Sequence, residues 1–217
     1  MYSRQHFDEA LDALNQEVLT MGTLVEEALR NAVKALVDKD IDLADRVIQG
    51  DTDIDRQQLD IEDTCTVLIA KEQPVASDLR QLVATLNVLG DLERIGDQAV
   101  HIAEVMKRLY GEPYMKPLID IPRMAVIAEG MIHDALTAFV EQDPEAARSV
   151  AGRDDQLDAL HAQVLRELLT YMMEDPAKIS QGINFLFLSR WLERTGDHVT
   201  NICERTVFLA TGKHVTF

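Results

Sequence analysis

One fourteen-residue segment occurs twice in this chain, 100 residues apart, and it constrains the fold more than any other feature. Residues 91–104 read DLERIGDQAVHIAE and residues 191–204 read WLERTGDHVTNICE, with seven of the fourteen positions identical. Nearer the N-terminus of each copy the match continues at an offset of 103, since residues 50–55 align with residues 153–158. The change of three falls at a predicted turn, where insertions and deletions are tolerated. The sequence therefore predicts two related units in tandem.

Apolar residues of the first and third predicted helices recur at alternating steps of four and three, the pattern of long helices that pack along a seam. The first seam begins with Phe7, Leu11, Leu14 and Val18. Proline, glycine and aspartate signals between the seams mark the helix ends. They predict six helices: from residue 5 to the mid-thirties, 42–71, 74–109, 119–141, 144–173 and 176–211. Long helices with short turns pack as antiparallel bundles, so the predicted class is all-α, two tandem antiparallel three-helix bundles with a pseudo-twofold internal repeat.

The boundary between the units is predicted in the Gly- and Pro-rich stretch of mid-chain, residues 111–117. The first three-helix repeat then covers residues 1–111 and the second covers residues 117–217. Hydrophobic residues make up 47% of the chain, enough for a packed core. The sequence opens with a polar amphipathic segment and has no apolar run of 18 residues, and its two cysteines lie far apart. We therefore expect a cytoplasmic protein with buried free thiols.

The formal net charge is −17, which bears on the partners that the chain can bind. A surface this acidic repels phosphate backbones and anionic headgroups, so non-specific binding to nucleic acid and direct insertion into membranes are not expected. It is suited to cations or to a basic surface on a partner. Acidity alone is also explained by solubility.

Each unit carries two pairs of acidic residues spaced i,i+4, which places both carboxylates of a pair on one helix face. Like charges at this spacing destabilise a helix by about 0.2–0.5 kcal/mol per pair, so four repeated pairs call for a reason. Oxygen-rich clusters bind hard or borderline cations, and iron, zinc, manganese or magnesium would fit. The alternative is an ordinary solvated face neutralised by Arg56, Arg94 and Arg194. The predicted metal ligands are Asp51, Asp55, Glu93, Asp97, Asp154, Asp158, Glu193 and Asp197.

Sequence signals for catalysis are missing from the chain. There is no Gly-rich phosphate loop, no GxSxG motif and no nucleophile–base pair. The Glu-x-x-His motifs of ferritin-like di-iron proteins are also missing. We therefore predict a protein that is not an enzyme, with no catalytic residues and no organic cofactor. Gly96 and Gly196 occupy the same repeat position inside helices, which indicates close approach of another helix or a ligand.

These residues resemble the PhoU family of phosphate-uptake regulators. The segments LERIGD (92–97) and LERTGD (192–197) are similar to the family's paired signatures, and QPVASDLR (73–80), TYMMED (170–175) and RVIQGD (46–51) also fit. The resemblance covers nearly the whole chain. It implies two three-helix bundles, metal binding at the four acidic pairs, and homodimers.

The resemblance also implies a function. PhoU proteins act as negative regulators of the phosphate starvation response, as adaptors that couple the ATPase subunit of the phosphate ABC transporter to a membrane sensor histidine kinase. The alternative function is a metal-dependent enzyme, or a metal-storage or metal-homeostasis protein that uses the same carboxylates. A substrate-sized pocket at the carboxylates would favour the enzyme, and an open acidic face would favour the adaptor.

Overall fold

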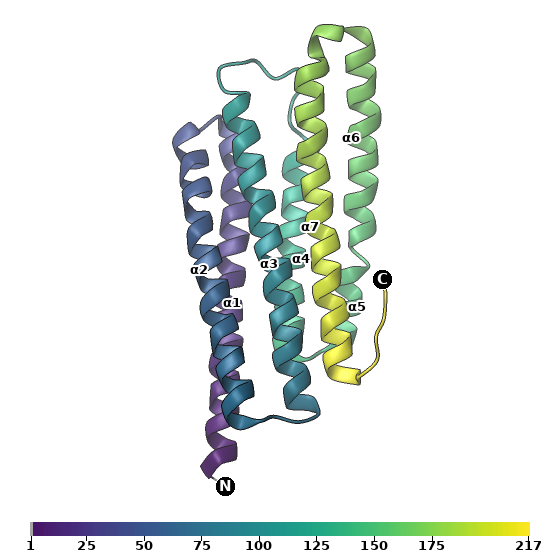
Figure 1. Cartoon of the computed structure of the whole chain (residues 1–217). Coiled ribbons are helices and arrows are strands. Elements are labelled where there is room, and N and C mark those ends of the chain that lie inside the picture. Colours follow the sequence, from purple (N-terminus) through teal and green to yellow (C-terminus); the bar gives the residue numbers. More distant parts are fainter. Residues whose placement is uncertain (1) are drawn as a thin grey trace.

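The computed structural model describes the backbone of residues 2–217 and the side chains of residues 5–217. Seven α-helices and one short 3-10 turn form the fold, and this part of the chain contains no strand (Figure 1). The all-α prediction is therefore confirmed. The elements are α1 (Tyr2–Asp38), α2 (Ile41–Glu72), α3 (Ser77–Arg108), α4 (Asp120–Glu141), α5 (Pro144–Ala151), α6 (Asp154–Glu174), η1 (Pro176–Lys178) and α7 (Ile179–Thr211).

The helix ends follow the local signals in the sequence. The Asp40 carboxylate accepts a hydrogen bond from the backbone N–H of Leu43 at 2.9 Å and so caps the N-terminus of α2. Asp143 caps α5 in the same way, with Pro144 at the first helical position. Gly212 ends α7 with φ +71°, a left-handed conformation that glycine adopts without strain.

The prediction of a single helix over residues 144–173 is wrong. The structure has two helices there, α5 and α6, separated by a turn at Gly152 and Arg153. The guanidinium of Arg153 reaches α4, where it pairs with Asp134 at 2.5 Å. This ion pair with a residue of another helix holds the turn in place. The acidic residues in the first turn of α6 also favour a helix N-terminus there, because they interact well with the helix dipole. In the first unit, α2 runs unbroken through the aligned position, Gly50.

The two units pack side by side into one body. In the first unit α1, α2 and α3 pack against one another, and in the second α4, α5 and α6 pack against α7. The units meet where α3 lies along α7 and α1 lies along α4, and Figure 1 shows α3 and α7 adjacent in the middle of the molecule. Seam residues such as Leu14, Val18 and Met21 are fully buried, and one hydrophobic cluster contains residues of both units. The twice-repeated segment therefore lies on the two central helices.

The segment between α3 and α4 is fixed to both units. The Tyr114 hydroxyl donates a hydrogen bond to the backbone carbonyl of Leu36 in α1 at 2.7 Å. Its ring packs edge-on against Phe185 of α7, with 5.6 Å between centroids. Lys116 is buried and forms an ion pair with Glu167 of α6. These contacts tie the connection to helices α1, α6 and α7.

Candidate functional site

The first set of predicted metal residues comes together where α2 packs against α3. Asp51 and Asp55 lie on α2, and Glu93 and Asp97 lie on α3. Burial raises the pKa of Asp51, and the negative charges of Asp55 and Asp97 raise it further. Burial likewise raises the pKa of Glu93, with added repulsion from Asp97, Asp55 and Asp51. The four carboxylates therefore lie close enough to interact, and we call them the first acidic cluster.

The second acidic cluster has the same arrangement between α6 and α7. It consists of Asp154 and Asp158 on α6 with Glu193 and Asp197 on α7. Burial, reinforced by Asp158 and Asp197, raises the pKa of Asp154 to about 6. Burial also raises the pKa of Glu193 to about 7, with repulsion from the other three acids of the cluster. Asp55, Asp158 and Asp197 are solvent-exposed, whereas the other five acids of the two clusters are half-buried or buried. Asp51 and Asp154, which lie against the opposite helix, are the inner aspartates.

The paired glycines explain how the inner acids come so close to the opposite helix. A Cβ atom on Gly96 would lie 3.2 Å from the Cδ1 of Ile54 and 3.6 Å from a carboxylate oxygen of Asp51. A Cβ atom on Gly196 would lie only 2.1 Å from the Oδ1 of Asp154. The close approach predicted for both glycines is therefore present. The group nearest to Gly196 is the inner aspartate of the neighbouring helix, Asp154, whereas Ile54 lies nearest to Gly96 and Asp51 lies slightly farther away.

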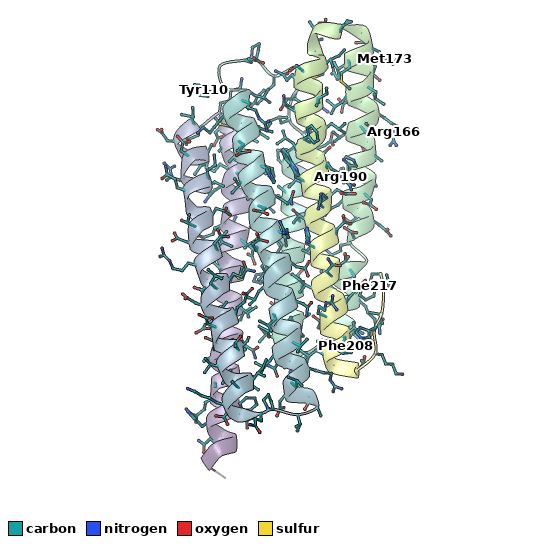
Figure 2. All side chains as sticks on the ribbon, in the orientation of Figure 1. Tyr110, Arg166, Met173, Arg190, Phe208 and Phe217 are labelled. Carbon is teal, nitrogen blue, oxygen red and sulfur yellow. The ribbon has the colours of Figure 1, made fainter. Side chains whose placement is uncertain are left out.

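Arginines partly neutralise both clusters, although not all of them are those expected from the sequence. Arg94 contacts Asp97 at 3.1 Å and Glu93 at 3.4 Å. In the second cluster Glu193 pairs with Arg190, three residues earlier on α7, and the label in Figure 2 marks Arg190 on the middle of this helix. Arg56 contacts Asp53 at 3.9 Å, outside the first cluster. The neutralising partners within reach are therefore Arg94 and Arg190.

The donor atoms of the clusters fit a cation only in part. The Oδ1 of Asp154 and the Oε2 of Glu193 are buried and have no hydrogen-bond partner in the described part of the chain. Glu193 is 8% exposed, so its free oxygen is costly to bury as an anion. Over residues 5–217, however, no three acidic, histidine or cysteine side chains are positioned to hold an ion together. Side chains would therefore have to rotate before the clusters could bind a metal ion. The second cluster already has two unpartnered carboxylate oxygens that could serve as ligands.

A polar contact that the sequence did not predict joins the two central helices. Asp91 of α3 accepts a hydrogen bond from the side-chain amide of Asn201 at 3.0 Å, and a ring nitrogen of His198 lies 3.0 Å from the same oxygen. At the equivalent place in the pseudo-twofold arrangement, His101 stacks on Trp191 with 5.1 Å between ring centroids. One sequence signal could have pointed to this contact. Within the repeated segment the aligned positions 91 and 191 are an aspartate and a tryptophan, so the two units differ in chemistry there.

Comparison with known proteins agrees with the duplicated fold. The family model described as the PhoU domain matches twice, over residues 18–106 and 121–206. A protein of Clostridium acetobutylicum named "Phosphate-specific transport system accessory protein PhoU homolog" is 41% identical over 214 residues, covering 98% of both chains. The similarly named Escherichia coli protein is 35% identical over 207 residues, covering 95% of this chain and 86% of its own length.

Solved structures agree as well. The crystal structure of PhoU from Pseudomonas aeruginosa superposes with a TM-score of 0.91 at 37% identity, covering 95% of this chain and all of that one. The phosphate transport system regulatory protein PhoU of Streptococcus pneumoniae gives a TM-score of 0.90 at 34% identity, covering 97% of this chain and all of its own. Among residues 2–217, no helix is long and apolar enough to cross a membrane. The duplicated helical fold, the family model that matches both units and the full-length similarity show that this chain belongs to the PhoU family.

Proposed function

We propose that this chain is a regulatory accessory protein of a phosphate-uptake system. In this role it holds off the phosphate starvation response when phosphate is adequate. It would act in the cytoplasm as an adaptor between the ATPase subunit of a phosphate ABC transporter and a membrane sensor histidine kinase, as a homodimer. The observation that supports this most directly is the match over 98% of the length of a relative named as a phosphate transport accessory protein.

The shape of the acidic clusters favours an adaptor over an enzyme. An enzyme needs a concave site that removes its substrate from water. Cavities of about 210, 260 and 590 Å³ are present in the structure, and none of the eight cluster carboxylates lines them. The outer acids Asp55, Asp158 and Asp197 are exposed to solvent. This arrangement supports a role in binding a cation or a partner rather than in turning over a substrate.

We further propose that the acidic clusters bind a metal ion, with the second cluster binding more tightly. Carboxylate oxygens suit iron, zinc, manganese and magnesium. Binding would replace the repulsion that raises the pKa of Asp154 and Glu193 with attraction to the cation. Arg190 would have to release Glu193, and Arg94 would have to release Glu93 and Asp97 in the first cluster. The alternative function, metal storage or metal-dependent catalysis, would use the same ligands.

A genetic experiment tests the regulatory proposal. The gene is deleted in its own organism, and alkaline phosphatase activity is measured in high phosphate with and without a plasmid that restores the protein. We expect high activity in the deletion strain and repression on complementation. If expression stays repressed without the protein, the proposed negative regulation is refuted.

A second experiment tests metal binding separately. Bound metal is measured by elemental analysis after purification and dialysis against each of the four ions, in the wild type and in Glu193→Gln/Asp197→Asn. The control is Glu141→Gln/Glu145→Gln, which makes the same change of net charge at two exposed acids outside the clusters. We expect the control to match the wild type and the cluster variant to lose metal. Equal or negligible metal in all three proteins would support the solvated-face alternative.

A further inference from the structure

The second unit contains a built site for a guanidinium group. Arg153, in the turn between α5 and α6, donates to the carboxylate of Asp134 at 2.5 Å and to the backbone carbonyl of Ile127 at 3.5 Å, both on α4. A Cβ atom on Gly130 would lie 2.8 Å from a guanidinium nitrogen of Arg153. Glycine at this position therefore leaves the room that the guanidinium occupies. We call Asp134, Gly130 and the Ile127 carbonyl the arginine seat.

The first unit has a cavity where the second unit has its arginine. Arg153 aligns with Gly50 at the repeat offset of 103, so the aligned position has no side chain to fill the space. A Cβ atom on Gly50 would meet no heavy atom within 4 Å. The counterparts of the arginine seat and of Arg153 all line one cavity of about 210 Å³ between α1 and α2, namely Asn31, Glu27, Leu24 and Gly50. We call this space the first-unit cavity.

We propose that the first-unit cavity binds the arginine side chain of a partner polypeptide. Its polar lining includes the carboxylates of Glu27 and Asp53 and the amide of Asn31, all of which can accept hydrogen bonds. A guanidinium group is planar, always charged and carries five donors, which suits a site with several acceptors. Arg46 also lines the cavity, and Arg56 contacts Asp53 from outside it at 3.9 Å. Over residues 5–217 no ion pair engages Glu27, so its carboxylate is the acceptor that a guanidinium group would meet first.

Several observations favour an arginine side chain over a small molecule. Pockets for whole small ligands usually measure about 300–1,000 Å³, and this cavity is smaller, at about 210 Å³. The occupant of the equivalent place in the second unit is itself an arginine side chain of a polypeptide. A net charge of −17 also attracts basic surfaces. The second unit therefore supplies its own arginine, and the first unit accepts one from outside.

The direct test uses Nα-acetyl-L-arginine amide as a probe that imitates an arginine within a chain. It is titrated into the ¹⁵N-labelled full-length protein to about 10 mM, tenfold above a Kd of about 1 mM. We expect saturable changes in the amide signals of Gly50 and Asn31. The uncharged citrulline analogue is expected to cause none. No change, or equal changes with the citrulline analogue, would overturn the proposal, and markedly tighter binding of free L-arginine would assign the cavity to a metabolite instead.

Variants localise the effect. Glu27→Gln/Asp53→Asn removes both negative charges with little change in shape and is expected to weaken probe binding about tenfold or more. Glu141→Gln/Glu145→Gln makes the same change of net charge elsewhere and is expected to bind like the wild type. Gly50→Arg, which fills the cavity from within, is expected to abolish binding. Probe binding that is unchanged in the charge variant would refute the assignment, whether or not Gly50→Arg folds.

Discussion

Replacement of Gly196 by alanine is expected to destabilise the protein, although alanine favours a helix over glycine by about 0.5–1 kcal/mol. The new Cβ atom would lie 2.1 Å from the Oδ1 of Asp154 and 2.8 Å from the Cδ1 of Leu157. Both atoms must move, and overpacking of this kind costs about 1–3 kcal/mol. Because the nearer contact is so short, the cost lies in the upper part of that range. The net loss in the free energy of unfolding is then about 1–2 kcal/mol.

Two other helical glycines serve as matched controls. A Cβ atom on Gly96 would lie 3.2 Å from the Cδ1 of Ile54, a tight contact that a shift of a few tenths of an ångström relieves. In Gly96→Ala the gain in helix propensity and the cost of the tight contact should then nearly cancel, which leaves the free energy of unfolding close to that of the wild type. A Cβ atom on Gly90 would meet nothing within 4 Å, so Gly90→Ala should stabilise the protein by about 0.5–1 kcal/mol.

Urea unfolding followed by circular dichroism measures the three free energies, and unchanged m-values would show that the transitions are comparable. From most to least stable, the expected order of the three variants is Gly90→Ala, Gly96→Ala and Gly196→Ala. If Gly196→Ala is as stable as the wild type or more stable, the second acidic cluster does not depend on a glycine-sized gap, and the close packing of Asp154 on α7 is wrong.

Three further outcomes follow from the structure. Burial raises the pKa of Glu193 from 4.5 to about 7, so the folded protein binds a proton more tightly than the unfolded chain between these values, and stability falls as the pH rises through them. Glu193→Gln should reduce this fall in urea titrations at pH 5 and pH 7.5, and an unchanged difference would contradict the reasoning. Tyr114→Phe removes the hydrogen bond to Leu36 and should cost about 0.5–1.5 kcal/mol by thermal or urea unfolding, whereas no loss would show the bond to be unimportant. Burial raises the pKa of the thiols of Cys65 and Cys203 to about 12, so a disulfide reagent should label them only after denaturation, and rapid labelling of the folded protein would be inconsistent with their burial.

Much of the fold was predictable because its signals are local or repeated. Steps of four and three place Leu14, Val18 and Met21 on one helix face, and all three are fully buried. The cap at Asp143 with Pro144 marks a helix start whatever surrounds it. The acidic pairs were visible because they recur in register, and their convergence follows once neighbouring helices pack.

Other features depend on contacts between distant segments. The break between α5 and α6 was missed because the aligned residues of the first unit are predicted within one helix, and because the contact that holds the turn, from Arg153 to Asp134, reaches another helix. The local signals, Gly152 and the two acids after Arg153, also occur inside helices. The contact of Asp91 with His198 crosses from one unit to the other. Such contacts depend on how each helix is rotated about its own axis. The apolar pattern shows which face of a helix is buried, but it does not fix that rotation closely enough to pair individual polar side chains.

The all-α class and the duplication could be read from the amino-acid sequence, because helix periodicity and internal repetition need no knowledge of long-range contacts. The sequence also indicates which carboxylates are candidate ligands. Which acids turn inward depends on the packing of the helices, since the position of Asp154 against Gly196 is set by how closely α6 approaches α7. The same holds for the aligned positions Gly50 and Arg153. The sequence shows that they differ, and the packing of α1 on α2 and of α4 on α5 turns that difference into an open cavity in one unit and a filled seat in the other.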